Sequence, residues 1–253
     1  MEARPAAIAT SLARRPIVDR RARLMTGLAA SLGVIFVGLA LAMRQAKGTS
    51  IDVAVTHAVQ WIDNPVFTDL MVAVSAPGYA PFSWMVVGSV IAALIVARLY
   101  REVPFVLATE CAGMMVASIK LLVERPRPAD ESIRVFSAVL DYSFPSGHVV
   151  GYVSLYGFLF FLVYVRFRRS WWRTAALTVL ALLVGLIGLS RIHLGHHWVS
   201  DVLGGYALGT AYLLLLVEAY RLLVVMPRMG GRSAPEPSCR RPDARGPEAT
   251  VPL

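Results

Sequence analysis

The sequence predicts an all-α, polytopic membrane protein with six transmembrane helices. Of its 253 residues, 57% are hydrophobic and 16% are charged, whereas about a quarter of the residues in an average soluble domain are charged. The mean hydropathy is +0.60, and six apolar runs each approach the ~20 residues needed to cross a bilayer. The net charge of +9 is spread over short basic clusters between these runs. Such spacing is typical of a membrane protein rather than of one that binds nucleic acid.

The predicted elements fall into three regions. Residues 1–23 are expected to form a basic cytoplasmic arm, residues 24–226 the six-span domain, and residues 227–253, rich in Pro, Arg, Ser and Gly, a disordered cytoplasmic tail. The stretch Ser50–Ser75 is amphipathic and is interrupted at Asn64-Pro65, which predicts one or two short interfacial helices between the first and second spans. The expected spans are Leu24–Met43, Ala80–Ala97, Val103–Val123, Gly147–Val165, Thr174–Ser190 and Val202–Val217.

The distribution of lysine and arginine predicts the orientation of these spans. Eighteen of the 25 basic residues lie in the two terminal segments and in the connections after the second and fourth spans, and seven lie at the other side. Cytoplasmic segments carry the excess of basic residues. We therefore expect a multi-pass protein of a bacterial-type inner (cell) membrane, with both termini in the cytoplasm and the other face extracytoplasmic.

Three polar stretches then fall together on the outer face. Lys120–Pro128 ends the third span, Pro145–His148 begins the fourth, and Ser190–Asp201 joins the fifth to the sixth. Ionisable groups beside a hydrocarbon core are costly and mark functional sites. Their convergence on one side predicts a shared site.

Three cations in this set indicate what the site binds. Lys120, Arg127 and Arg191 would bring three positive charges to one pocket, and such a cluster suits a phosphoryl group, whose oxygens gain charge in the transition state. Ser146 and Gly147, at the start of a helix, would offer a hydroxyl and backbone N–H groups to the same anion. These five residues are the predicted phosphate-binding set.

Two histidines and an aspartate indicate the chemistry. His197 and Asp201 are four residues apart and so lie on one face of a helix. Asp201 could accept a proton from one ring nitrogen of His197 and leave the other nitrogen free to attack phosphorus. His148, which comes from another helix, could protonate the leaving oxygen. These three residues are the predicted catalytic set.

The three stretches together resemble the signature of a known family. The spacing Lys-x6-Arg-Pro, then Pro-Ser-Gly-His, then Ser-Arg-x5-His-x3-Asp is similar to that of the type 2 phosphatidic acid phosphatases, integral-membrane lipid phosphate phosphatases related in fold to the vanadium-dependent haloperoxidases. The resemblance implies a phosphohistidine intermediate on His197, with His148 as the acid and no metal or other cofactor. The residues that carry it are Lys120, Arg127, Pro128, Pro145, Ser146, Gly147, His148, Ser190, Arg191, His197 and Asp201.

Other polar residues have plainer interpretations. His193, His197 and Asp201 could imitate a metal site, but adjacent arginines disfavour a cation and no cysteine or second carboxylate completes a coordination sphere. Glu110, near the middle of the third span, is interpreted as a neutral, hydrogen-bonded packing residue, with a role in the substrate pocket as the alternative. The residues interpreted as interfacial anchors are His193, His196, Glu124 and Arg125.

The predicted function is hydrolysis of a lipid phosphomonoester or diphosphate at the outer membrane face. The resemblance to bacterial members places undecaprenyl diphosphate first among substrates, followed by phosphatidylglycerophosphate and phosphatidate. Two alternatives stay open: a phosphotransferase that passes the phosphoryl group to a lipid or sugar acceptor, and a non-catalytic lipid-binding or transport protein on the same scaffold. The non-catalytic alternative is disfavoured because a binding protein needs no nucleophile, acid or orienting carboxylate. The residues that form this complete set are Lys120, His148, His197 and Asp201. The loop Ala129–Phe144 is expected to influence the choice of head group.

Overall fold

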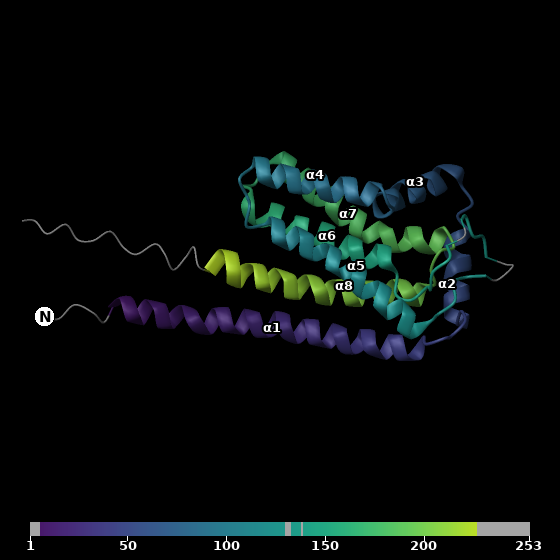
Figure 1. Ribbon diagram of the computed structural model, residues 1–253, viewed down its shortest axis with the longest axis horizontal. Coiled ribbons are helices and arrows are strands. Elements are labelled where there is room, and N and C mark those ends of the chain that lie inside the picture. Colours follow the sequence, from purple (N-terminus) through teal and green to yellow (C-terminus); the bar gives the residue numbers. More distant parts are fainter. Residues whose placement is uncertain (1–5, 130–132, 138, 227–253) are drawn as a thin grey trace, which may run out of the picture.

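The fold is a bundle of helices that run side by side along the long axis of the molecule (Figure 1). A computed structural model describes residues 6–129, 133–137 and 139–226, and every regular element within these ranges is helical. The elements are α1 (Ala6–Ala42), α2 (Ser50–Gln60), α3 (Pro65–Ser75), the short η1 (Ala76–Gly78), α4 (Phe82–Val96), α5 (Val103–Val123), α6 (Gly147–Arg166), α7 (Trp171–His193), α8 (Val199–Tyr220) and η2 (Arg221–Val225). The all-α prediction is confirmed.

The centre of the bundle is built by α6, which packs against α5, α7 and α8, while α1 packs on the outer side of α8. Two glycines allow α8 to approach α6 closely. A Cβ added at Gly205 would lie 2.9 Å from Cβ of Val149, and one added at Gly209 would lie 2.9 Å from Cβ of Val153. Small residues four apart let transmembrane helices pack closely, and here they hold the first turn of α6 against the start of α8.

The number of candidate spans agrees with the prediction. Five helices are long and apolar enough to cross a membrane, and a sixth span results if α3 with η1 and α4, which meet at a bend of 60°, are counted as one. The 15 residues of α4 are fewer than the ~20 that usually cross a bilayer, and α3 precedes it across the bend. Among the described elements, α2 lies across the end of the bundle (Figure 1).

The N-terminal part of α1 lies within the segment predicted to be a basic arm, since the helix begins at Ala6. The predicted tail, residues 227–253, lies outside the described residues.

Two short helices begin with strong capping signals. Thr49 and Asp52 form a reciprocal capping box at α2, and the Asn64 side chain caps α3 just before Pro65. Both caps fix the path of the chain around the end of the bundle.

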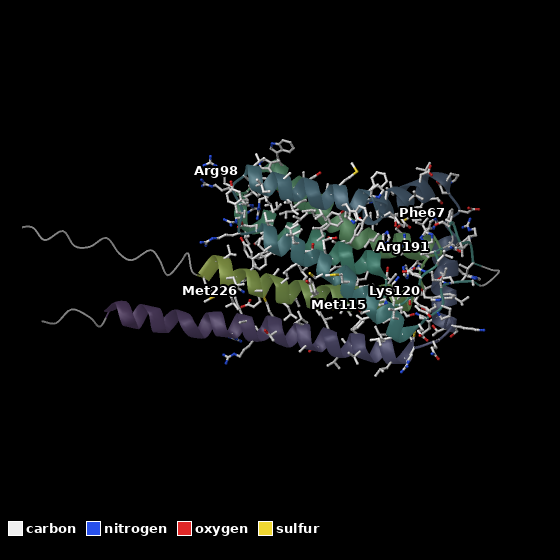
Figure 2. All side chains as sticks on the ribbon, in the orientation of Figure 1. Phe67, Arg98, Met115, Lys120, Arg191 and Met226 are labelled. Carbon is white, nitrogen blue, oxygen red and sulfur yellow. The ribbon has the colours of Figure 1, made fainter. Side chains whose placement is uncertain are left out.

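The connections that carry the three polar stretches meet at this same end of the bundle. The α5–α6 and α7–α8 connections lie beside α2, opposite the end at which α1 begins (Figure 1). Lys120 and Arg191 lie toward this end, whereas Arg98 and Met226 lie at the other (Figure 2). The predicted convergence of the three stretches is therefore present in the fold.

Candidate active site

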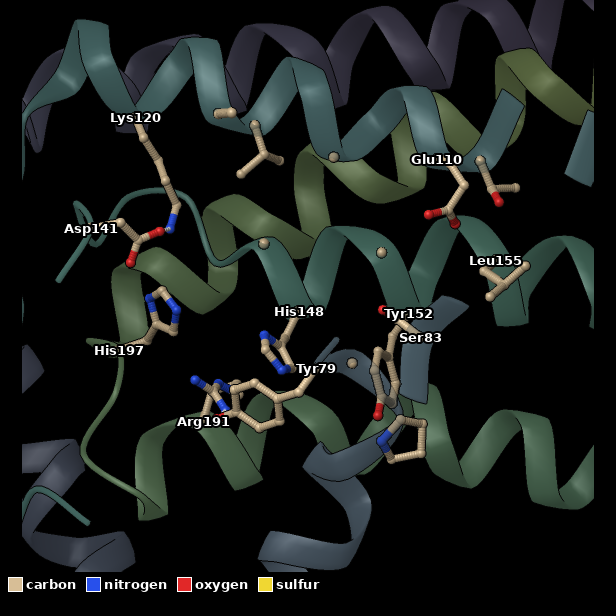
Figure 3. A pocket seen from close by; sticks show the side chains of 18 of the residues that line it. Tyr79, Ser83, Glu110, Lys120, Asp141, His148, Tyr152, Leu155, Arg191 and His197 are labelled. Atoms are coloured by element: carbon tan, nitrogen blue, oxygen red, sulfur yellow. Dashed lines mark hydrogen bonds and ion pairs between the residues drawn. The ribbon is translucent and has the colours of Figure 1, made fainter. Parts of the chain in front are cut away.

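A cavity of about 460 Å³ opens between α4, α5, α6 and the α7–α8 connection (Figure 3). It contains most of the predicted site at its outer end and extends along α5 and α6 toward the middle of the bundle. Predicted site residues that line the cavity are Lys120, Arg127, Gly147, His148, Arg191 and His197. Asp201 and Ser146 are not among the lining residues and lie behind them, with no exposed surface.

His197 lies in the connection between α7 and α8 and is almost completely buried. The turn that presents it depends on Gly195, which has φ +68° and whose added Cβ would lie 2.2 Å from the carbonyl oxygen of Arg134. The Nε2 atom of His197 lies 3.2 Å from Nη1 of Arg127. Burial lowers the pKa of His197 well below 6.5, and the positive charges of Arg127 and Arg191 lower it further. Both effects favour the neutral ring, whose Nε2 atom faces Arg127.

Asp201, in the first turn of α8, is held behind the His197 ring. Its Oδ2 atom lies 3.5 Å from Nδ1 of His197 and accepts hydrogen bonds from the Ser143 hydroxyl and, at 2.9 Å, from the backbone N–H of Trp198. Its Oδ1 atom accepts from Nη1 of Arg125 at 2.6 Å. The Ser143 hydroxyl also lies 3.5 Å from Nδ1 of His197, so this ring nitrogen faces both the hydroxyl and the carboxylate.

The interpretation of Arg125 as an interfacial anchor is wrong. Its side chain has no exposed surface and bridges Asp201 to Asp52 on α2, whose Oδ2 accepts from Nη2 at 2.7 Å. Burial would raise the pKa of Asp52, but hydrogen bonds from Ser200, Thr49 and Arg125 outweigh it and lower that pKa. A guanidinium between two carboxylates meets the requirement that a buried charge be paired. The Thr49–Asp52 capping pattern could have drawn attention to Asp52, but nothing in the sequence linked it to Arg125.

Asp141 was also missed by the sequence-based prediction. It lies in the loop between α5 and α6, where one carboxylate oxygen accepts from Lys120 (Figure 3) and the other accepts from Arg127. Burial opposes ionisation, yet the hydrogen bonds and charges of the two cations lower the pKa of Asp141 to about 2. Its side chain is 55% exposed, so the contact is accessible from solution. The only signal in the sequence was its place in the loop expected to influence head-group choice.

Arg191 and His148 approach the cavity beside the bend between α3 and α4. Arg191 is buried and donates to the Ser75 hydroxyl at 2.7 Å and to the Tyr79 hydroxyl. The His148 ring packs edge-on against the Tyr79 ring, with centroids 4.4 Å apart (Figure 3). Its buried Nε2 atom has no hydrogen-bond partner among the described atoms. His148 therefore has a ring nitrogen available for a proton transfer.

Ser146 and Gly147 lie at the junction where α6 begins. The backbone N–H of Ser146 donates to the carbonyl oxygen of Asp201 at 3.1 Å, and its hydroxyl, which is buried, has no partner within the described part of the chain. Gly147 is the first helical residue and lines the cavity. Its N–H is one of the unpaired donors at the start of a helix, which favour a bound anion.

Two further histidines are buried rather than anchored at the membrane surface. His193 is completely buried, with its Nε2 atom 3.0 Å from the Thr68 hydroxyl, and His196 is 3% exposed, with its Nε2 atom 2.8 Å from the Ser137 hydroxyl. Their interpretation as interfacial anchors is therefore wrong. Burial, and then the charges of Arg191 and Arg127, lower the pKa of His196 to about 4. Glu124, in contrast, is exposed.

Comparison with known proteins connects this geometry to a family. Residues 99–223 match the model of the PAP2 superfamily. Phosphatidylglycerophosphatase B of Bacillus subtilis is 28% identical over 192 residues, which cover 75% of this chain and 93% of that protein. Lipid phosphate phosphatase delta of Arabidopsis thaliana is 29% identical over 156 residues, which cover 58% of this chain and 36% of that protein.

Two solved structures share the fold. The PAP2-type phosphatidylglycerolphosphate phosphatase from Bacillus subtilis aligns with a TM-score of 0.67 and 25% identity, covering 77% of this chain and 96% of that one. Aquifex aeolicus LpxE aligns with a TM-score of 0.54 and 20% identity over 67% of this chain and 96% of that one, which supports the fold alone. The chain belongs to the PAP2 superfamily and is a membrane-embedded lipid phosphatase of the PAP2 type.

Proposed function

We propose that the protein hydrolyses a lipid phosphomonoester through a covalent phosphohistidine on His197. The observation that carries this proposal is the environment of the His197 ring. Its Nδ1 side lies beside Asp201, and its Nε2 side is directed toward Arg127 at the outer end of the cavity. A neutral imidazole held in one tautomer by a carboxylate is an activated nucleophile.

In the first step, the Nε2 lone pair of His197 attacks phosphorus and forms a P–N bond as the P–O bond to the lipid breaks. His148, carrying a proton, donates it to the departing lipid oxygen, which leaves as an alcohol. His148 reaches the same cavity from α6 and has an unpaired ring nitrogen. The Nδ1 proton of His197 stays beside Asp201, which stabilises the positive charge that develops on the ring.

In the second step, neutral His148 takes a proton from a water molecule, and the resulting hydroxide attacks phosphorus. The P–N bond breaks, phosphate leaves and His197 recovers its lone pair. Both residues thus return to their starting protonation states, and neither step consumes an oxidant, a reductant or a second substrate.

The charge of the site matches that of a phosphomonoester. Lys120, Arg127 and Arg191 carry three positive charges, and Asp141 carries one negative charge. The excess of positive charge among these four residues is suited to a phosphomonoester, which is a dianion above its second pKa of about 6. These cations would also stabilise the charge that gathers on the equatorial oxygens during transfer.

For the substrate, we place phosphatidylglycerophosphate first, because the B. subtilis relatives that this chain resembles in sequence and in fold are named for it. This order differs from the one predicted from sequence, in which undecaprenyl diphosphate came first. We further propose that the site faces the outside of the cell membrane and that both termini lie in the cytoplasm, on the basis of the uneven distribution of basic residues.

The two histidines can be separated by comparing two substrates with different leaving groups, with EDTA present throughout. His197→Ala should abolish both the phosphoenzyme and turnover on any substrate. His148→Ala should lose about 10²–10⁴-fold in rate on a lipid phosphate, whose alkoxide is a poor leaving group. It should lose far less on p-nitrophenyl phosphate, whose phenolate departs without protonation. Rapid-quench trapping of the phosphoenzyme and release of inorganic phosphate are the two measurements.

Because both substrates are measured on one preparation, a misfolded variant would lower both rates together. Equal losses of His148→Ala on the two substrates, in folded protein, would contradict its role as the acid. A phosphoenzyme that persists in His197→Ala would place the nucleophile elsewhere. Activity lost with EDTA and restored by a divalent cation would instead favour a metal mechanism.

A further inference from the structure

The inner end of the cavity holds a carboxyl group that the proposed mechanism does not use. Glu110, Gly113, Ala117 and Lys120 all line the cavity and recur every three or four residues, so they share one face of α5. Lys120 lies at the phosphate end, and Glu110 lies about 15 Å further along the helix axis, at ~1.5 Å per residue. The Glu110 carboxyl group points into the space between α5 and α6 (Figure 3).

The surroundings of Glu110 do not explain it as a packing residue. No hydrogen bond or ion pair is formed by its carboxyl group with any residue that the structure describes, and its side chain is exposed. Two hydroxyl groups nearby are already engaged, since Thr109 donates to the carbonyl oxygen of Val106 at 2.7 Å and Tyr152 to that of Val74 at 2.6 Å. A carboxyl group within a membrane span is costly unless it serves a function. These surroundings do not support the packing role expected for Glu110. They support the alternative, a role in the substrate pocket.

The middle of the cavity stays open between the two ends. Gly113 on α5 and Gly151 on α6 both line it, and a Cβ added at either glycine would meet no atom within 4 Å. A substrate bound by its phosphate at Lys120 can thus extend inward past these glycines. The first polar side chain of α5 that it would meet along this face is Glu110.

The separation of the two ends limits which lipids can use both. An extended chain advances about 1.2 Å per bond, because three backbone bonds of a residue span about 3.5 Å, so ~15 Å corresponds to about a dozen bonds. In phosphatidylglycerophosphate, a glycerol and a phosphodiester separate the terminal phosphorus from the acyl esters. About twelve bonds lie between this phosphorus and the nearest acyl-ester carbonyl oxygen. In phosphatidate the same carbonyl follows after about six bonds, and a polyprenyl chain has none.

We propose that Glu110 determines which lipid is hydrolysed. Its carboxylic acid donates a hydrogen bond to an acyl-ester carbonyl of a glycerophospholipid, while the phosphomonoester of the same lipid is bound at Lys120 and Arg127. Within a membrane span, the neutral form of a carboxyl group costs less free energy than the charged form. The neutral Glu110 carboxyl group offers one O–H donor. Ester carbonyls are acceptors only, so donor and acceptor are complementary. The inference rests on the proposed function and adds the part of the lipid that the cavity recognises beyond the phosphate.

The test compares kcat/KM for phosphatidylglycerophosphate with that for phosphatidate in each of several variants. Loss of one hydrogen bond in an apolar site should lower the ratio of the two values by about tenfold in Glu110→Met. Glu110→Gln keeps an N–H donor and should restore most of the ratio. Ser118→Ala removes an exposed hydroxyl from the same helix outside the cavity and should leave the ratio unchanged.

A second pair of variants tests the route between the two ends. Gly151→Leu should fill the open part of the cavity and lower kcat/KM for both lipids, whereas Gly185→Leu, at an equally open position on α7 away from the cavity, should not. An unchanged ratio in Glu110→Met, or a Glu110→Gln variant that behaves like Glu110→Met, would overturn the specificity proposal while leaving the phosphatase proposal intact. Absence of phosphate release by the wild-type protein from every lipid phosphate would overturn both.

Discussion

Asp141 pairs with the two cations that the proposed substrate requires and therefore competes with its phosphate. Its carboxylate bridges Lys120 and Arg127, so one anion already lies where the phosphoryl oxygens of a lipid would bind. A substrate must displace this carboxylate, and product phosphate must compete with its return. We therefore expect Asp141 to weaken the binding of substrate and of product phosphate. Weaker binding of phosphate would favour its release after hydrolysis.

Replacing Asp141 should therefore tighten the binding of inorganic anions. We expect Asp141→Asn to lower the concentration of orthovanadate or phosphate that gives half-maximal inhibition by about two- to thirtyfold, because two partly exposed ion pairs contribute ~0.2–1 kcal/mol each. Inhibition of phosphate release by graded vanadate is the measurement. Asp63→Asn, which breaks an exposed pair with Arg134 at the same end of the molecule, is the matched control. Weaker inhibition in Asp141→Asn would show that Asp141 positions the cations rather than competing for them.

At the scale of the elements, Arg125 links three parts of the chain that carry the site. It extends from the α5–α6 connection to Asp52 on α2 and to Asp201 on α8. It also donates to the Ser200 hydroxyl at 2.6 Å. The Asp201 carboxylate, which lies beside His197, is thus linked through Arg125 to α2, which lies across the end of the bundle (Figure 1). The same contact explains why a buried arginine is tolerated here.

Removal of this arginine should destabilise the bundle strongly. Arg125→Gln leaves two buried carboxylates without their cation, and breaking a buried ion pair in this way costs about 3–5 kcal/mol. The variant should show a much lower thermal unfolding midpoint in detergent than the wild type. Arg134→Gln removes a guanidinium from a half-exposed pair and should shift the midpoint little. Similar shifts in the two variants would contradict the structural role assigned to Arg125.

Sequence reasoning reached the spans and the signature residues but not the contacts between distant segments. Hydropathy detects a span because the bilayer fixes its length, and the motif spacing selected His148, His197 and Asp201, whose catalytic roles stay a prediction. Arg125 was misread because its partner Asp201 lies 76 residues away, and no local pattern reports such a pair. The bend of 60° between α3 and α4 could not be predicted for a related reason, since hydropathy reports how apolar a segment is and not the direction in which it runs.

At the scale of the whole molecule, the proposed site and the arginine-bearing α4–α5 and α6–α7 connections lie at opposite ends of the bundle (Figure 1). The proposed site gathers where the α5–α6 and α7–α8 connections meet, whereas α1 begins and the α4–α5 and α6–α7 connections lie at the far end (Figure 1). Those far segments, with the C-terminal region, carry eighteen of the 25 basic residues. The proposed outward orientation of the site therefore depends on one property of the sequence, the asymmetry of its positive charge.

Cysteine labelling can test this orientation without disturbing the charge. Leu140, fully exposed in the α5–α6 connection, and Tyr100, 60% exposed in the α4–α5 connection, are uncharged positions at the two ends. In a background with Cys111→Ala and Cys239→Ser, Leu140→Cys should react with a membrane-impermeant maleimide in intact cells, and Tyr100→Cys should react only after permeabilisation. The permeabilised sample also shows that Tyr100→Cys is reactive at all. The reverse pattern would place the site in the cytoplasm, and the substrate phosphate would then have to be presented on the inner leaflet, where soluble phosphate acceptors also have access.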